Sequence, residues 1–155
     1  MAASSMSTRR GRELDEIAEA LPQRASTLLK IFLARSTVPV SRTEASVLSA
    51  LDQRSWRITE LAAREHITQP GVTLLVNRLE QRGWAKREAD PADRRVVLVT
   101  LTPEGRDALA NLRAEYRALL HEEIATLPDE DVCTLARAIE VLDGLIERLS
   151  GGERQ

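Results

Sequence analysis

Apolar residues recur at intervals of three and four along the first part of the chain. Between Leu14 and Phe32 this spacing places them on one face of a helix. Pro22 lies inside the run, so we expect a kink or a break there. The preceding residues, 1–11, are mostly small or basic and have no apolar stripe, which predicts a disordered arm. We therefore assign residues 12–40 to an N-terminal helical segment.

Two short helices are predicted next. Ser41 and Glu44 form a capping box, in which the serine oxygen and the glutamate bind free backbone N–H groups. The helix that begins there is expected to stop near Gln53. A second amphipathic helix covers residues 57–65, and a tight connection, residues 66–68, follows it.

The helix after this connection runs from Gln69 to about Arg82. Thr68 is its predicted cap, and Pro70 is tolerated because it lies in the first turn, where N–H groups have no helical partners. Gly83 is predicted to end the helix. The apolar residues of this helix form one stripe, made of Val72, Leu75, Val76 and Leu79.

Two segments have the pattern of β-strands, residues 84–89 and residues 96–101. The second segment alternates in hydrophobicity and is rich in β-branched residues. Polar, turn-forming residues occupy the positions between them, 90–95. The pair therefore predicts a two-stranded β-hairpin with a charged tip.

Two long helices are predicted to complete the chain. Thr102 is a cap followed by Pro103 at the first helical position, and acidic residues 129–131 lie at the start of the last helix. The apolar residues of the last helix alternate in steps of three and four, which is the pattern of a coiled-coil seam. They are Val132, Leu135, Ile139, Leu142, Ile146 and Leu149. Residues 150–155 are expected to form a disordered tail.

Composition narrows the possible functions. No apolar run approaches the roughly 18 residues that span a membrane, and no signal sequence is evident, so we expect a soluble, cytoplasmic protein. Cys133 is the only cysteine, which excludes an intramolecular disulfide, and no His/Cys spacing suggests a metal site. No nucleophile–base set or phosphate-binding loop is present, so we expect neither an enzyme nor a cofactor.

The charge is unevenly distributed along the chain. The net charge is −2, which at first argues against a nucleic-acid partner. Residues 42–100, however, contain ten Arg or Lys and eight Asp or Glu, whereas the flanking segments contain twelve and sixteen. The middle of the chain is therefore weakly basic and the ends are acidic, a distribution that permits DNA binding by the middle segment.

The polar face of the helix from Gln69 to Arg82 carries groups that suit base recognition. Glutamine and asparagine make paired hydrogen bonds with adenine, and threonine can touch a thymine methyl group. Every amphipathic helix has a polar face, so this helix alone also fits an ordinary solvated surface. The residues on this face are Gln69, Pro70, Thr73, Leu74, Asn77, Arg78 and Gln81.

The tip of the predicted hairpin adds a second candidate contact with DNA. Arg94 and Arg95 lie at the turn, from which an arginine can enter a narrow minor groove. Asp93 does not suit a phosphate contact, but its carboxylate can orient a neighbouring arginine. A solvated turn with a weak local ion pair is the alternative interpretation.

These segments together resemble the MarR family of winged helix-turn-helix regulators over residues 14–149. The hairpin and the start of the following helix are the most specific part of this resemblance, whereas the helix-turn-helix residues are shared with many winged-helix families. The matching segments are Thr59–Ala62, Thr68–Thr73, Leu79–Glu80, Gly83–Trp84, Asp93–Arg95 and Leu101–Gly105.

The resemblance implies a mainly α-helical homodimer that binds a near-palindromic operator. Residues 41–101 correspond to the DNA-binding lobe, and residues 12–40 and 102–149 to the dimerisation helices. Two recognition helices would enter successive major grooves ~34–36 Å apart. By the family pattern, Asp93 supports the wing arginine, Arg95 enters the minor groove and Arg94 lies near phosphate. The predicted dimer contacts are Leu112, Tyr116, Leu119, Leu135, Ile139, Leu142, Ile146 and Leu149.

The chain departs from the family pattern at two positions of the recognition helix. Leu74 lies where many relatives have Arg or Lys, and Asn77 where Asp is frequent, so the operator preference of relatives does not transfer.

Many relatives bind small aromatic or phenolic ligands, and others sense oxidants through a cysteine near the N-terminus, a position that Cys133 does not match. We therefore expect a repressor that a small molecule releases from DNA. The alternatives are an interaction module without DNA binding and an oxidation sensor that uses Cys133.

Overall fold

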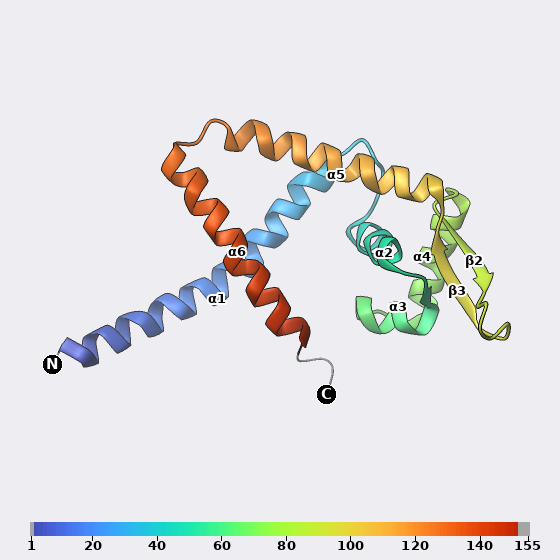
Figure 1. The fold of residues 1–155 in the computed structure, drawn as a ribbon, viewed down its shortest axis with the longest axis horizontal. Helices are drawn as coiled ribbons and strands as arrows, with labels where there is room; N and C mark the ends of the chain where they lie inside the picture. Colours follow the sequence, from blue (N-terminus) through green and yellow to red (C-terminus); the bar gives the residue numbers. More distant parts are fainter. Residues whose placement is uncertain (1, 152–155) are drawn as a thin grey trace. The chain divides into compact units, whose positions relative to one another are not determined.

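The computed structural model describes residues 2–151 of the chain, which form six helices and a small sheet (Figure 1). The chain divides into two compact units, and the division falls after Tyr116, within the fifth helix. In chain order the elements are α1 (Ala2–Arg35), α2 (Arg42–Gln53), β1 (Trp56–Arg57), α3 (Ile58–Glu65), α4 (Gln69–Gln81), β2 (Ala85–Ala89), β3 (Val97–Leu101), α5 (Pro103–Ile124) and α6 (Asp129–Gly151).

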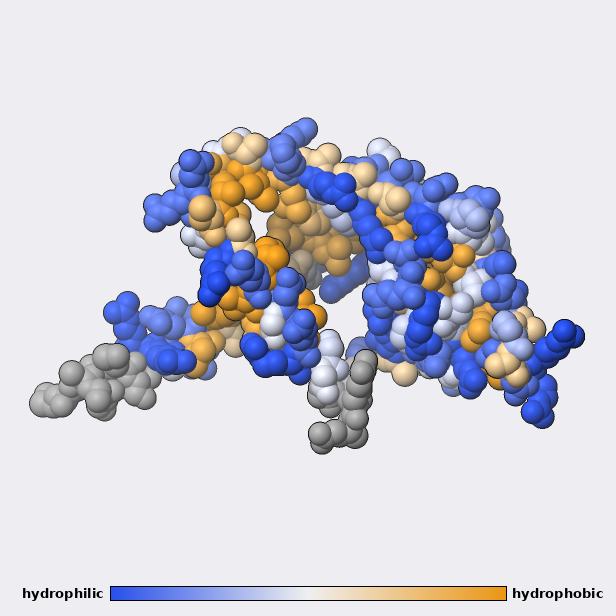
Figure 2. Space-filling view, in the orientation of Figure 1, coloured by the Kyte–Doolittle hydropathy of each residue, from blue (hydrophilic) through white to orange (hydrophobic). Residues whose placement is uncertain are grey.

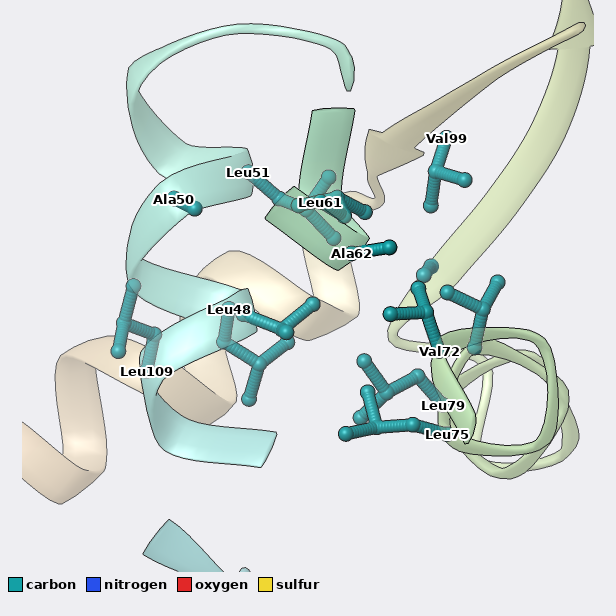
Figure 3. Close-up of a cluster of buried hydrophobic side chains, with 13 residues drawn as sticks. Leu48, Ala50, Leu51, Leu61, Ala62, Val72, Leu75, Leu79, Val99 and Leu109 are labelled. Carbon is teal, nitrogen blue, oxygen red and sulfur yellow. The ribbon is translucent and has the colours of Figure 1, made fainter. Parts of the chain in front are cut away.

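The first unit has a hydrophobic core to which every element from α2 to the start of α5 contributes. Leu48 of α2, Leu61 of α3 and Val99 of β3 are fully buried. The predicted stripe of α4 faces them, since Val72 and Leu79 are also fully buried (Figure 3). The winged-helix lobe therefore has a complete core within a single chain.

The helix boundaries agree with the caps predicted from the sequence. Ser41 and Glu44 form the expected capping box, with the Ser41 N–H donating to the Glu44 carboxylate at 2.8 Å. Thr68 Oγ1 accepts a hydrogen bond from the Gly71 N–H at 3.3 Å, and Thr102 Oγ1 accepts one from the Gly105 N–H at 3.0 Å. These oxygens satisfy N–H groups that lack helical partners, and so fix where α2, α4 and α5 begin.

The sheet differs from the prediction because it has three strands. Trp56 and Arg57 form β1, which pairs antiparallel with β3 and gives the strand order β1-β3-β2. The two-stranded wing predicted from the sequence is therefore only the β2–β3 part. A strand of two residues is too short to show an alternating pattern. Trp56 is held there by its indole N–H, which donates to the Ala50 carbonyl at 2.8 Å.

The N-terminal segment is also more regular than predicted. Residues 2–11 form the first turns of α1 instead of a disordered arm, and residue 1 lies outside the described residues. An ion pair between Arg9 and Glu13 at 3.0 Å, one helical turn apart, supports this part. The helix continues through Pro22, so the proline removes one backbone donor without breaking the helix.

The second unit contains the end of α5 and the whole of α6 as far as it is described. No residue of α6 is buried, and hydrophobic side chains are visible on its surface (Figure 2). Ser150 and Gly151 of the predicted tail belong to α6, whereas residues 152–155 lie outside the described part. None of the helices within residues 2–151 is long and apolar enough to cross a membrane.

Candidate nucleic-acid interface

Helices α3 and α4 form a helix-turn-helix whose turn is set by His66. This residue has a left-handed backbone conformation, with φ of 53°, and ends α3. The Ile67 N–H then donates to the Ala62 carbonyl at 3.1 Å, which closes the last turn of α3. Thr68 follows directly as the cap of α4, so the connection between the two helices is short.

The residues predicted to face DNA lie together on one side of α4. Gln69, Pro70 and Arg78 are exposed, and Leu74 is 62% exposed. Thr73 and Asn77 are half-buried. The exposed positions lie opposite the buried stripe, so α4 presents a mixed polar and apolar surface outside the core.

Arg78 has a partner that the sequence analysis did not identify. Its Nε donates to the carboxylate of Glu44 at 3.2 Å, and Arg82 Nη1 lies 3.8 Å from the same group. Only 4% of Glu44 is exposed. Burial raises the pKa of Glu44, but hydrogen bonds from Ser41 and Arg78 and the charge of Arg82 outweigh it, so the pKa lies below its usual value. Glu44 therefore joins the cap of α2 to the recognition helix.

Helix α4 also contacts β2 through Arg87. The Arg87 Nη2 donates to the Oδ1 of Asn77 at 2.9 Å, and the Nη1 forms an ion pair with Glu80. Arg87 and Glu80 were not among the predicted site residues. The sequence does not indicate this contact, because it depends on how β2 packs beside α4 in the folded lobe.

A turn joins β2 to β3 (Figure 1), and Arg94 and Arg95 belong to this turn. The Asp93 carboxylate accepts hydrogen bonds from the backbone N–H of Arg95 at 3.1 Å and from its Nε at 3.2 Å. Both bonds hold the pKa of Asp93 below its usual value. The Arg95 side chain is 91% exposed, and Arg94 is exposed as well. The wing tip therefore presents an oriented cation to the solvent.

The base of the wing is joined to the start of α5. The Thr102 N–H donates to the Trp84 carbonyl at 3.1 Å, and the Thr102 hydroxyl donates to the Gly83 carbonyl at 2.5 Å. A Cβ atom at Gly105 would lie 2.0 Å from the Trp84 carbonyl oxygen, so only glycine fits there. Two separate sequence segments, 83–84 and 101–105, thus pack together at one point.

A cavity of about 350 Å³ lies beside the lobe, within the first unit. Tyr116 lines it and stacks on Phe32, with ring centroids 4.9 Å apart. The Tyr116 hydroxyl is buried and has no hydrogen-bond partner among residues 2–151. Other residues that line the cavity are Leu29, Arg42, Arg64, Leu112 and Arg113.

The predicted dimer contacts fall into two groups. Leu112 is only 2% exposed in the single chain, so its side chain belongs to the interior of the first unit and is removed from the predicted dimer surface. In contrast, Ile139 and Ile146 of α6 are 57% and 58% exposed.

Cys133 is exposed on α6. Among the described residues there is no cluster of His, Cys, Asp or Glu that could hold a metal ion.

Comparisons with known proteins agree on one family. The model of the MarR family matches residues 40–97. The chain is similar to the HTH-type transcriptional repressor MdtR of Bacillus subtilis, with 31% identity over 91 residues that cover 58% of this chain. The matched segment spans 59% of MdtR.

Two solved structures extend the similarity to most of the chain. The transcriptional regulator BldR of Sulfolobus solfataricus is 28% identical, with a TM-score of 0.66 over 89% of this chain and 95% of that protein. The apo form of MarR from E. coli is 24% identical, with a TM-score of 0.65 over 83% and 96%. The likeness to MarR shows a shared fold.

Proposed function

The chain belongs to the MarR family, and from this premise we propose that it is a sequence-specific DNA-binding regulator of transcription. The observation that carries the proposal is the wing tip, where Asp93 orients a 91% exposed Arg95 beyond the body of the lobe. An arginine held in this way suits the minor groove, where the negative potential is concentrated. The exposed face of α4 would occupy the adjacent major groove.

We further propose that the regulator acts as a homodimer on a near-palindromic operator. The apolar faces of α1 and α6 support this proposal, because Ile17 of α1 is 60% exposed and Leu149 of α6 is 76% exposed. Burying one such side chain is worth about 1.5–3 kcal/mol, so a second copy of the chain would gain by covering these faces. Tyr116 and Leu119 are half-buried and would lie at the edge of the dimer contact.

The cavity beside Tyr116 supports release from DNA by a small aromatic or phenolic effector. The cavity combines apolar walls from Leu29 and Leu112 with the guanidinium groups of Arg42 and Arg64. This set suits an acidic group on an apolar ring. We expect an aromatic acid such as 4-hydroxybenzoate, at millimolar concentration, to lower the affinity of the protein for its operator. The variant Arg42→Met should not respond to the acid, and its operator affinity without the acid should equal that of the wild type. An equal response of the wild type and the variant would contradict the assignment of the cavity as the effector site.

The direct test of DNA binding is the variant Arg95→Ala. The probe is a duplex that the wild-type protein selects from a random-sequence library, and the affinity is measured at physiological salt. We expect about tenfold weaker binding, or ~1.4 kcal/mol, with the dimer unchanged by light scattering. The matched control is Arg137→Ala, which removes an exposed arginine from α6, where it pairs with Glu140 at 2.9 Å. Equal affinities of the two variants would contradict the role of the wing.

Two alternatives predict different results in the same assay. A winged-helix module that binds only proteins would enrich no duplex from the library. An oxidation sensor that uses Cys133 would be released from DNA by peroxide as wild type but not as Cys133→Ser.

A further inference from the structure

Asn77 is a predicted DNA-facing residue whose side chain is held by a strand of the wing. It lies one helical turn from Leu74 and Gln81, on the side of α4 opposite the buried stripe. Arg87 of β2 donates from Nη2 to the Asn77 Oδ1 at 2.9 Å. Glu80, on α4, forms an ion pair with the Nη1 of the same arginine. Arg87 is therefore fixed on both sides, with only 29% of its side chain exposed.

The chemistry of this contact determines how the Asn77 amide is turned. A guanidinium group has five N–H donors and no acceptor, so Arg87 can bind only the oxygen of the amide. The Nδ2 group, with its two donors, must then point away from Arg87. Because the donor set of arginine is fixed, the orientation does not depend on telling the oxygen and nitrogen of the amide apart.

We infer that Asn77 contacts DNA as a hydrogen-bond donor through Nδ2, and that Arg87 is the positioning residue that imposes this choice. The inference rests on the proposed function and specifies the chemistry of its base contact. The base edges that fit are acceptors in the major groove, namely N7 or O6 of guanine, N7 of adenine and O4 of thymine. The paired contact with adenine expected from the sequence also uses the amide oxygen, and Arg87 already takes one of the two lone pairs of that oxygen.

The variant Asn77→Asp separates this inference from a purely structural role. Aspartate has nearly the same shape, and its carboxylate accepts the Arg87 hydrogen bond more strongly because both groups are charged. The fold is therefore kept. The outward-facing atom, however, changes from a donor to an acceptor. A residue that matters only for packing would tolerate this change, whereas a donor to a base edge would not.

The experiment compares the base preferences of full-length variants on a random-sequence duplex library. We expect the wild type to require an acceptor base at one position of each half-site. Asn77→Asp should lose that preference and bind the wild-type duplex at least tenfold more weakly. Arg87→Met should relax the preference at the same position only. The control is Lys86→Met, which removes a neighbouring cation of β2 that pairs with Glu88 at 2.8 Å.

A double variant tests whether Arg87 acts through Asn77. Asn77→Ala combined with Arg87→Met should have the same base profile and affinity as Asn77→Ala alone, because the residue that Arg87 positions is absent. If Arg87→Met sharply lowers the thermal unfolding temperature, the test uses Arg87→Lys instead. Lysine keeps a positive charge beside Glu80 but lacks the planar set of guanidinium donors.

Two outcomes overturn the inference, and they are distinguishable from failure of the proposed function. A uniform loss of affinity for all sequences in Arg87→Met, additive with Asn77→Ala, would show that Arg87 only stabilises the lobe or contacts phosphate. An unchanged profile in Asn77→Asp would show that Asn77 does not read a base. Failure of the wild type to enrich any duplex would instead refute the proposed function, and the inference with it.

Discussion

Helices α4 and α6 have similar hydrophobic patterns but opposite environments. In α4 the apolar stripe is buried, with Leu75 the most accessible of its members at 3%. In α6 no residue is buried, and Ile139 keeps 57% of its surface accessible. An apolar stripe therefore shows which face of a helix needs to be covered. It does not show whether the covering residues belong to the same chain.

The largest expected effect concerns the uncovered face of α6. The double variant Ile139→Asp/Ile146→Asp would place two unpaired charges in the proposed dimer contact, and each such charge costs several kcal/mol when it is buried. We expect the dimer dissociation constant to rise at least ~100-fold, as measured by light scattering across a concentration series. The first unit should stay folded, because its core contains no residue of α6.

The control for this variant is Glu147→Gln, which changes an exposed polar position of the same helix. It should leave the dimer intact. If the aspartate variant remained fully dimeric at micromolar concentration, α6 would not form the contact, and the comparison between α4 and α6 would need another explanation.

Two glycines test the same difference between the packed first unit and the exposed α6, with a smaller expected effect. Gly105→Ala should destabilise the lobe by about 1–3 kcal/mol, because the added methyl group overlaps the Trp84 carbonyl oxygen. Gly144→Ala in α6 should be stabilising by about 0.5–1 kcal/mol, since its nearest neighbour is the end of the Arg148 side chain at 3.6 Å. Thermal unfolding measures both changes, and destabilisation of equal size in the two variants would contradict the close approach at Gly105.

The smallest expected loss of stability concerns the buried Glu44. Because the folded-state pKa of Glu44 lies below 4.5, its charged form adds stability above that pH, and this contribution is lost as the pH falls through the folded pKa. Glu44→Gln should therefore lower the unfolding temperature at neutral pH, by the equivalent of about 1–2 kcal/mol. The difference from wild type should shrink below pH 4.5. A difference that stays constant over the whole range would mean that the charge on Glu44 is not involved.

Local chemistry made the first-unit fold predictable from the sequence. Ser41, Thr68 and Thr102 each mark a helix start through one side-chain oxygen, and the structure has a cap at each of these positions. The buried stripe of α4 follows from helical spacing alone. Such features depend on residues within one turn of each other, so a single sequence is enough to recognise them.

Features that depend on contacts between distant segments were not predicted. Glu44 and Arg78 are 34 positions apart, and Arg87 reaches Asn77 across the turn between α4 and β2. The sequence predicts Leu112 as a dimer contact, because the periodicity of α5 cannot distinguish a face that packs on its own lobe from one that packs on a partner. Leu112 packs within its own unit. Tertiary packing decides such cases.

The contact of Thr102 and Gly105 with residues 83–84 has a mechanical consequence. The base of the hairpin and the first turn of α5 are joined by two hydrogen bonds and a close backbone approach. A change in the direction of the first turn of α5 would therefore also move the base of the hairpin. The wing tip lies at the other end of the hairpin from this junction. A small tilt of α5 about the junction would therefore displace Arg95 by a larger distance.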